Sequence, residues 1–184
     1  MNFQDTQLIG VLARAESTVS SLSSLLGGLV EKFAARGYSL YLVGGSVRDA
    51  LLGRLGNDLD FTTPARPEVV KEILDEWAET VWDTGIDFGT VSAAYKGQQI
   101  EITTFRSDSY DGQSRNPEVV YGDTLEGDLV RRDFKANAMA IELLADASFK
   151  FHDPLHGLQD IADRVLDTPD KPEISFHDDP LRML

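Results

Sequence analysis

The sequence predicts an α+β fold, with a mixed or antiparallel sheet that carries its helices on one face. Three observations predict it. A stretch of helical periodicity precedes the first strand. A short apolar strand runs directly into a glycine pair and a helix. A later helix is followed by three strands, two of which form a hairpin. A helix laid between strands and followed by a hairpin is typical of this class.

Composition limits the classes of function. The chain has 184 residues, enough for one well-cored domain, and 42% of them are hydrophobic. Its formal charge is −14, from 31 acidic and 17 basic side chains. Because affinity for a polyanion rises when Lys and Arg neutralise phosphates, this balance argues against a chain that grips nucleic acid alone. If RNA is a substrate, we expect most of its binding surface to lie elsewhere.

The compartment is predicted from what the sequence lacks. It has no cysteine, so it offers neither a disulfide framework nor a thiolate metal site. It has no run of about twenty apolar residues, and its first ten residues, MNFQDTQLIG, lack the basic-then-apolar pattern of a signal peptide. These features predict a cytoplasmic protein without a membrane partner.

The first element is expected at residues 19–35. Residues 1–18 are mixed and polar and are predicted to form a weakly ordered lead-in. Apolar residues then recur at helical spacing, and a helix is expected to close at Gly37. The apolar residues of this helix are Leu22, Leu25, Leu26, Leu29, Val30 and Phe33. We assign them to the core rather than to a partner-binding stripe, and we predict that the main domain spans residues 19–168.

A glycine pair joins the first strand to the next helix. The apolar run Leu40–Val43 reads as a buried strand that stops at Gly44 and Gly45. Ser46 is the expected N-cap of the helix that follows, and Arg48 lies in its first turn. Glycines let backbone N–H groups approach a bulky anion, and a helix N-terminus and an arginine both favour phosphate. The corner is therefore predicted to bind phosphate.

Two aspartates lie on the next strand, at residues 57–63. On a strand, Asp58 and Asp60 share one face while Leu59 and Phe61 pack behind it. Two neighbouring carboxylates repel each other, and a divalent cation, Mg²⁺ or Mn²⁺, would relieve that repulsion. Glycine corners and Asp-x-Asp pairs are each common without any function. Their succession within about twenty residues is more specific.

A third helix is predicted next, followed by three strands that complete the sheet. The helix is expected over residues 67–79, and the strands over residues 80–82, 89–95 and 99–105. Glu101, at the start of the last strand, is the candidate for a third carboxylate at a metal site, although an exposed strand glutamate is an equal alternative. Arg106 follows as a ligand for phosphate or a partner for a site carboxylate.

A second cluster of polar residues occurs after a polar stretch, residues 107–116, that is predicted to be a mobile loop. The pattern at residues 123–126 is typical of a helix start. Arg131, Arg132 and Asn137 follow, and such side chains suit a triphosphate and a ribose hydroxyl. An Arg-Arg-Asp sequence on its own is most often a solvated ion pair.

Taken together, GGSVRDALLG, the following DLD, and the later RRD with Asn137 resemble the class II (bacterial-type) tRNA CCA-adding enzymes and poly(A) polymerases. These families belong to the polymerase β-like nucleotidyltransferases. The resemblance covers the chain from about Leu40 onward, but only the amino-terminal head of a family member. Lys135 and Ala136 replace the threonine and aliphatic residue that are usual there, which removes a hydroxyl contact expected at position 135.

The resemblance implies a polymerase β-like head, with residues 169–184 as a linker and the first turn of a truncated helical neck. It implies transfer of C and A from CTP and ATP to a tRNA 3′ end, with release of pyrophosphate and with two Mg²⁺ ions. Most RNA contacts would lie in the missing carboxyl-terminal regions. Asp58 and Asp60 would hold metal, with Glu101 beside them. The implied nucleotide-binding residues are Gly44, Gly45, Arg48, Arg132, Asn137, Asp179 and Arg182.

Three alternatives stay open at this point. A poly(A) polymerase would add A alone to RNA 3′ ends. A small-molecule nucleotidyltransferase would share the glycine pair and Asp-x-Asp but would need neither the RRD cluster nor a neck. A non-catalytic nucleotide-binding fragment would bind nucleotide without transferring it.

Overall fold

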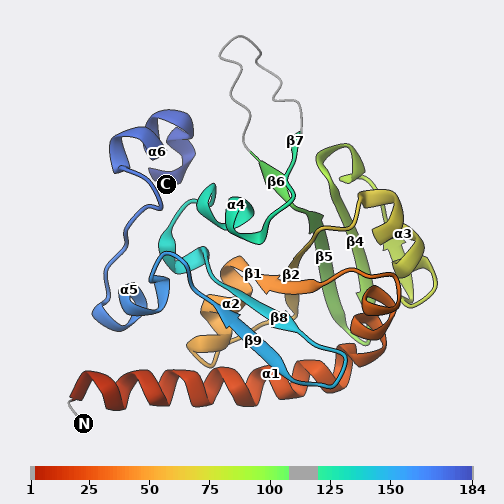
Figure 1. Ribbon diagram of the computed structural model, residues 1–184, viewed down its shortest axis with the longest axis horizontal. Helices are drawn as coiled ribbons and strands as arrows, with labels where there is room; N and C mark the ends of the chain where they lie inside the picture. Colours follow the sequence, from red (N-terminus) through yellow and green to blue (C-terminus); the bar gives the residue numbers. More distant parts are fainter. Residues whose placement is uncertain (1–2, 108–119, 184) are drawn as a thin grey trace.

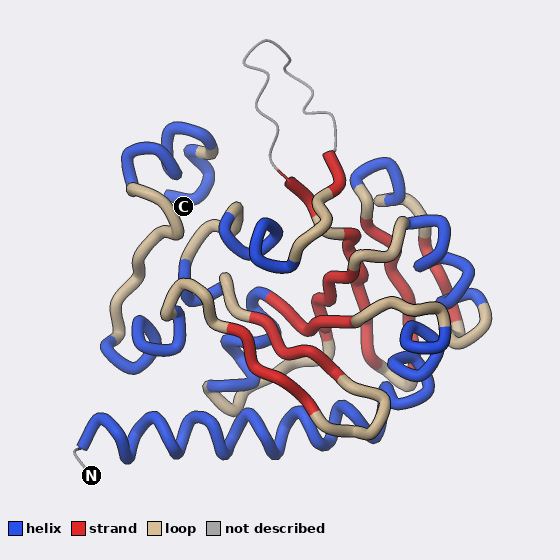
Figure 2. The backbone as a smooth tube through the Cα atoms, viewed as in Figure 1, coloured by secondary structure: helices blue, strands red, loops and turns tan. Residues whose placement is uncertain are grey.

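The computed structural model describes residues 3–107 and 120–183 and contains a seven-stranded sheet (Figures 1 and 2). The strand order is β3-β4-β5-β2-β1-β8-β9. β2 pairs with β5 in parallel, and the other neighbours in this sheet pair antiparallel. The predicted α+β class with a mixed sheet is confirmed.

The strands of this sheet are β1 (Leu40–Val43), β2 (Asp58–Thr63), β3 (Thr80–Trp82), β4 (Thr90–Tyr95), β5 (Gln98–Thr104), β8 (Ala140–Leu143) and β9 (Phe149–His152). A two-stranded ribbon pairs β6 (Arg106–Ser107) with β7 (Val120–Tyr121). The α-helices are α1 (Phe3–Ala35), α2 (Gly44–Leu51), α3 (Pro67–Asp75), α4 (Leu125–Val130), α5 (Gly157–Asp163) and α6 (Pro172–Asp178). The 3-10 helices are η1 (Ile86–Phe88), η2 (Lys135–Asn137) and η3 (Pro180–Met183).

Helix α1 is longer than the sequence pattern suggested. It begins at Phe3, where a weakly ordered segment was expected over residues 1–18. Val11, Ala15 and Val19 are all buried and follow one another at a spacing of four residues. That spacing places them on one helix face, so they extend the apolar stripe toward the amino terminus. In Figure 1, α1 runs across the whole width of the molecule.

The main core lies between the sheet and helices α1, α2 and α3. Leu59 and Phe61 of β2 are each 1% exposed and belong to this core. Because side chains alternate along a strand, Asp58 and Asp60 point to the opposite face of the sheet. On that face, Leu129 of α4 packs with Val43 of β1 in a smaller apolar cluster. Most helices therefore share one face, as predicted, while α4 covers part of the other.

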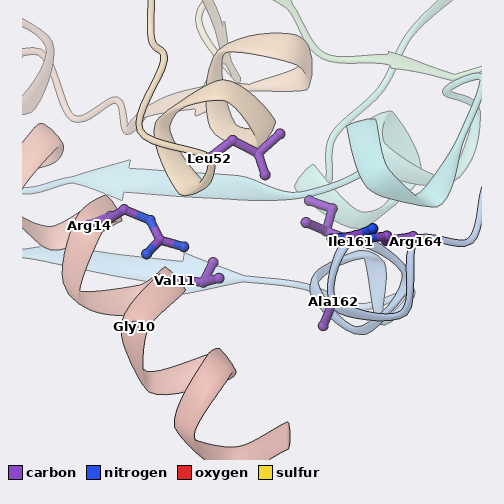
Figure 3. A pocket seen from close by; sticks show the side chains of 7 residues that line it. All are labelled: Gly10, Val11, Arg14, Leu52, Ile161, Ala162 and Arg164. Atoms are coloured by element: carbon purple, nitrogen blue, oxygen red, sulfur yellow. The ribbon is translucent and has the colours of Figure 1, made fainter.

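A cavity of about 400 Å³ lies between α1, the end of α2 and α5 (Figure 3). Its lining residues are Gly10, Val11, Arg14, Leu52, Ile161, Ala162 and Arg164. No predicted site residue contributes to it. In the described part of the chain, no helix is both long and apolar enough to cross a membrane.

The carboxyl-terminal segment forms two short helical pieces. Within residues 169–184, expected as a linker and the first turn of a neck, helix α6 begins at Pro172 and Pro180 opens η3. The division of the chain after residue 168 stays a prediction. Of the predicted loop at residues 107–116, all but Ser107 lies outside the described residues.

Candidate nucleotidyl-transfer site

The diglycine corner is tied directly to the aspartate strand. Ser46, expected as an N-cap, lies inside α2, which begins at Gly44 after Val43 without a side-chain cap. The Ser46 hydroxyl instead accepts a hydrogen bond from the Asp60 amide at 3.0 Å and donates to the Asp58 carbonyl at 3.4 Å. The hydroxyl is used between elements because it is buried beside β2. This contact holds the diglycine corner beside the part of β2 that carries the two aspartates.

Three carboxylates gather on the open face of the sheet. Asp58 and Asp60 share this face of β2, and Glu101 lies beside Asp60 in the register with β5. Partial burial, then the charges of Glu101 and Asp58, raise the pKa of Asp60, while Arg132 acts against them. Repulsion among these carboxylates is what a bound divalent cation would relieve.

The carboxylates do not form a complete metal shell by themselves. Throughout residues 3–107 and 120–183, no group of three or more acidic, histidine or cysteine side chains is arranged to hold a metal ion. Mg²⁺ in phosphoryl-transfer sites commonly uses one or two protein carboxylates and takes its other ligands from substrate phosphates and water. Asp58 and Asp60 fit that pattern, with Glu101 as their neighbour.

Arg132 reaches the diglycine corner from the other side. A Cβ atom on Gly44 would lie 3.0 Å from Arg132 Nη1, and Gly44 has a φ of +66°. Glycine is therefore needed both for the backbone conformation and for the approach of the guanidinium. Arg132 Nη2 donates to Asp128, whereas its buried Nε has no hydrogen-bond partner among the described residues. Arg132 thus has donor capacity beside the corner.

Arg48 belongs to a network of protein side chains. Its Nε and Nη2 donate to the two carboxylate oxygens of Asp49, at 3.0 and 3.2 Å. Its Nη1 donates to Asn137 Oδ1 at 2.8 Å, and Asn137 Nδ2 donates to Asp133 at 3.0 and 3.1 Å. The structure therefore joins Arg48 and Asn137, which are 89 residues apart in sequence. This hydrogen-bond network sets the orientation of the Arg48 and Asn137 side chains beside the diglycine corner.

Asp128 is a residue that our sequence reasoning missed. It is fully buried and lies in α4, three and four residues before Arg131 and Arg132. Burial would raise the pKa of Asp128, but the charges of Arg132 and Arg131 outweigh it and hold this pKa below its usual range. An acidic residue at these spacings from two arginines on a predicted helix is a signal that could have revealed the cluster.

Residues 40–167 match the family described as the poly A polymerase head domain. Of the predicted site residues, only Asp179 and Arg182 lie outside this range. The chain belongs to this family. A CCA-adding enzyme of Listeria innocua serovar 6a is 41% identical over 157 residues, which are 85% of this chain and 38% of that protein. The chain therefore spans well under half the length of the relatives it matches.

Solved structures agree with this assignment. The crystal structure of the Bacillus stearothermophilus CCA-adding enzyme in complex with CTP has a TM-score of 0.72 and 37% identity, and the match covers 88% of this chain and 37% of that one. A tRNA nucleotidyltransferase complexed with a primer tRNA and an incoming ATP analog has a TM-score of 0.68 and 31% identity, with coverage of 84% and 42%. The predicted family and head fold are confirmed.

In this member of the poly A polymerase head family, Arg182 lies after the matched residues and reaches back to Arg131. Its Nη2 donates to the Arg131 carbonyl at 3.1 Å, and its Nη1 donates to Ser175 Oγ at 2.8 Å. Asp179 lies beside it, with 3.7 Å between its Oδ2 and Arg182 Nε. The structure therefore brings Arg182 next to α4, although it is 51 residues from Arg131 in sequence.

The two positions that depart from the family pattern have structural roles here. Lys135 forms an ion pair with Asp167, at 2.5 Å, and Ala136 is buried.

Arg106, expected at phosphate or a site carboxylate, instead directs its guanidinium to the Phe88 carbonyl and the Thr90 hydroxyl. Neither Lys135 nor Arg106 forms an ion pair with Asp58 or Asp60.

Proposed function

We propose that this head domain transfers C and A from CTP and ATP to the 3′ end of tRNA and releases pyrophosphate. The observation that carries the proposal is the Ser46 link, which holds the diglycine corner against Asp58 and Asp60. A triphosphate at the corner and a metal at the carboxylates would then meet at one place. The similarity to CCA-adding enzymes, one of them in complex with CTP, supports this choice of substrate.

Asp58 and Asp60 are the proposed ligands of two Mg²⁺ ions, with Glu101 supporting them; Mn²⁺ has the same preference for oxygen ligands. When bound, Mg²⁺ would activate the RNA 3′-hydroxyl and neutralise the leaving pyrophosphate. The raised pKa of Asp60 supports this role, because repulsion from Glu101 and Asp58 is what a cation relieves.

The other residues of the site would position the substrates for the reaction. In the transfer, the 3′-hydroxyl oxygen bonds to the α-phosphorus, the bond from that phosphorus to the pyrophosphate oxygen breaks, and the hydroxyl proton passes to water. The corner at Gly44 and Gly45, with Arg48 and Arg132, would hold the triphosphate for this in-line displacement. Asn137 would orient Arg48, and Asp179 and Arg182 would approach the nucleotide from the carboxyl-terminal side. No nucleophilic side chain is required.

An incorporation assay tests the function. The natural polypeptide that carries these residues is incubated with Mg²⁺, labelled CTP or ATP, and tRNA that lacks its 3′-terminal CCA. We expect C to be added first and A only after it. Binding of CTP without transfer would favour the non-catalytic reading, and transfer to a small molecule with none to tRNA would overturn the proposal.

Poly(A) addition is the second candidate, because the matching family is described as a poly A polymerase head domain. The same assay separates the two functions. A poly(A) polymerase would extend an RNA 3′ end with many A residues from ATP alone and would ignore CTP. A CCA-adding enzyme would stop after one A.

Replacing Arg132 by alanine is expected to weaken CTP and ATP binding by a similar factor, about tenfold or more. The reason is that its free donors lie at the glycine corner and would contact phosphate or sugar rather than base. Isothermal titration with each nucleotide and Mg²⁺ measures the effect, and Arg36→Ala, at an exposed arginine that pairs with Glu76, is the control. A loss confined to one nucleotide would contradict this role.

A further inference from the structure

We propose that Asp128 is a positioning residue that aims Arg132 at the nucleotide, an inference that rests on the function proposed above. Asp128 is not placed to touch substrate itself, because its carboxylate is completely buried. It would act by fixing the direction of a guanidinium that borders the diglycine corner.

The contacts divide cleanly between the two carboxylate oxygens of Asp128. Oδ1 accepts three hydrogen bonds, from Arg131 Nη2 at 2.8 Å, Arg131 Nε at 3.2 Å and the Arg106 amide at 3.1 Å. Oδ2 accepts one, from Arg132 Nη2 at 3.0 Å. One oxygen therefore anchors Asp128 to the end of α4 and to β6, while the other is left to hold Arg132.

The energetics favour a role beyond packing. A buried carboxylate loses several kcal/mol of hydration, and a buried ion pair is often no more stabilising than apolar residues of similar volume. What a carboxylate adds at this position is direction, because it fixes the Arg132 guanidinium at the glycine corner.

Asp128→Asn separates the two functions of the carboxylate. The three donors at Oδ1 require the amide oxygen to occupy that position, so the amide NH₂ group must face Arg132. The amide NH₂ group and Arg132 Nη2 are then two donors that face each other, so the hydrogen bond to Arg132 is lost. The contacts at the other oxygen, Oδ1, remain. Glu126→Gln, which removes one charge from an exposed position on the same helix, is the matched control.

The first measurement is nucleotide affinity. We expect Asp128→Asn to raise the Kd for both CTP and ATP, each with Mg²⁺, by about tenfold, and Glu126→Gln to leave both values unchanged. In an Arg132→Ala background, Asp128→Asn should raise the Kd less than twofold further, because the residue it positions is already absent. A purely structural role would instead give the full loss in both backgrounds, and that additivity would overturn the proposal.

The second measurement needs no nucleotide. The side-chain N–H signals of Arg132 in ¹⁵N-labelled protein should shift and broaden in Asp128→Asn. Backbone amide signals should keep their positions except in α4, at Arg131 and Arg132, and at Arg106, whose amide contacts Asp128. Unchanged Arg132 signals would overturn the positioning role. Absence of CTP and ATP binding by the unaltered protein would overturn the proposed function instead, so the two failures are distinguishable.

Discussion

Asp60→Asn should reduce nucleotide incorporation by at least about a thousandfold while leaving the protein at least as stable as before. The carboxylate is a proposed metal ligand, and an amide of the same shape binds Mg²⁺ poorly. Burial, then the charges of Glu101 and Asp58, raise the pKa of Asp60 against the opposing charge of Arg132, so the charged form is disfavoured in the folded state and its removal at neutral pH relieves both the burial cost and the repulsion. The measurements are incorporation of labelled CTP and thermal unfolding.

Asp87→Asn is the matched control for this substitution, because Asp87 is an exposed aspartate on η1, away from the carboxylate cluster. It should change neither activity nor stability. Asp58→Asn should behave like Asp60→Asn. Near-normal incorporation by either variant in the presence of Mg²⁺ would contradict the metal assignment, and unfolding of Asp60→Asn would contradict the electrostatic account.

Gly157→Ala should destabilise the protein by about 3 kcal/mol and lower its melting temperature by about 6–12 °C. A Cβ atom at this position would lie 2.1 Å from the Lys135 carbonyl oxygen and 3.2 Å from Met139 Cγ. The backbone cannot move away easily, because Asp153 Oδ1 accepts a 2.7 Å hydrogen bond from the Gly157 amide. Displacement of η2 would also disturb Asn137, so nucleotide affinity should fall.

Gly56→Ala provides the comparison for this effect. No atom lies within 4 Å of a Cβ atom built there, and the substitution should change stability by less than about 0.5 kcal/mol. Chemical denaturation of both variants gives the two free energies. Equal stability of Gly157→Ala and the unaltered protein would show that α5 and η2 are not packed as described.

The short-range features of the site could be predicted from sequence because each depends on local rules. The strand-glycine-helix corner follows from an apolar run interrupted by Gly44 and Gly45, and the shared face of Asp58 and Asp60 follows from strand alternation. The proximity of Glu101 also required the parallel pairing of β2 with β5, which the strand pattern alone does not specify.

Features set by tertiary packing were harder to predict. The first part of α1 has apolar residues mixed with polar ones, and the burial of Val11 and Ala15 depends on the other elements that pack against this helix. Ser46 was assigned to a cap because local spacing favours it, whereas its hydroxyl joins β2 across the fold. Asp128 was overlooked because a charged residue on a short helix usually faces water.

The central claim is that the diglycine corner and the aspartate strand act on one metal-bound nucleotide. Bound Mn²⁺ broadens nearby amide signals by paramagnetic relaxation. Titration of ¹⁵N-labelled protein with Mn²⁺ and CTP therefore shows whether the ion lies close to both the corner and the strand. We predict that the Gly45 and Asp60 amide signals broaden together when CTP is present, while that of Gly37, which precedes β1 at the end of the strand away from the corner, stays sharp. Broadening at Asp60 with none at Gly45, with CTP saturating, would contradict the account.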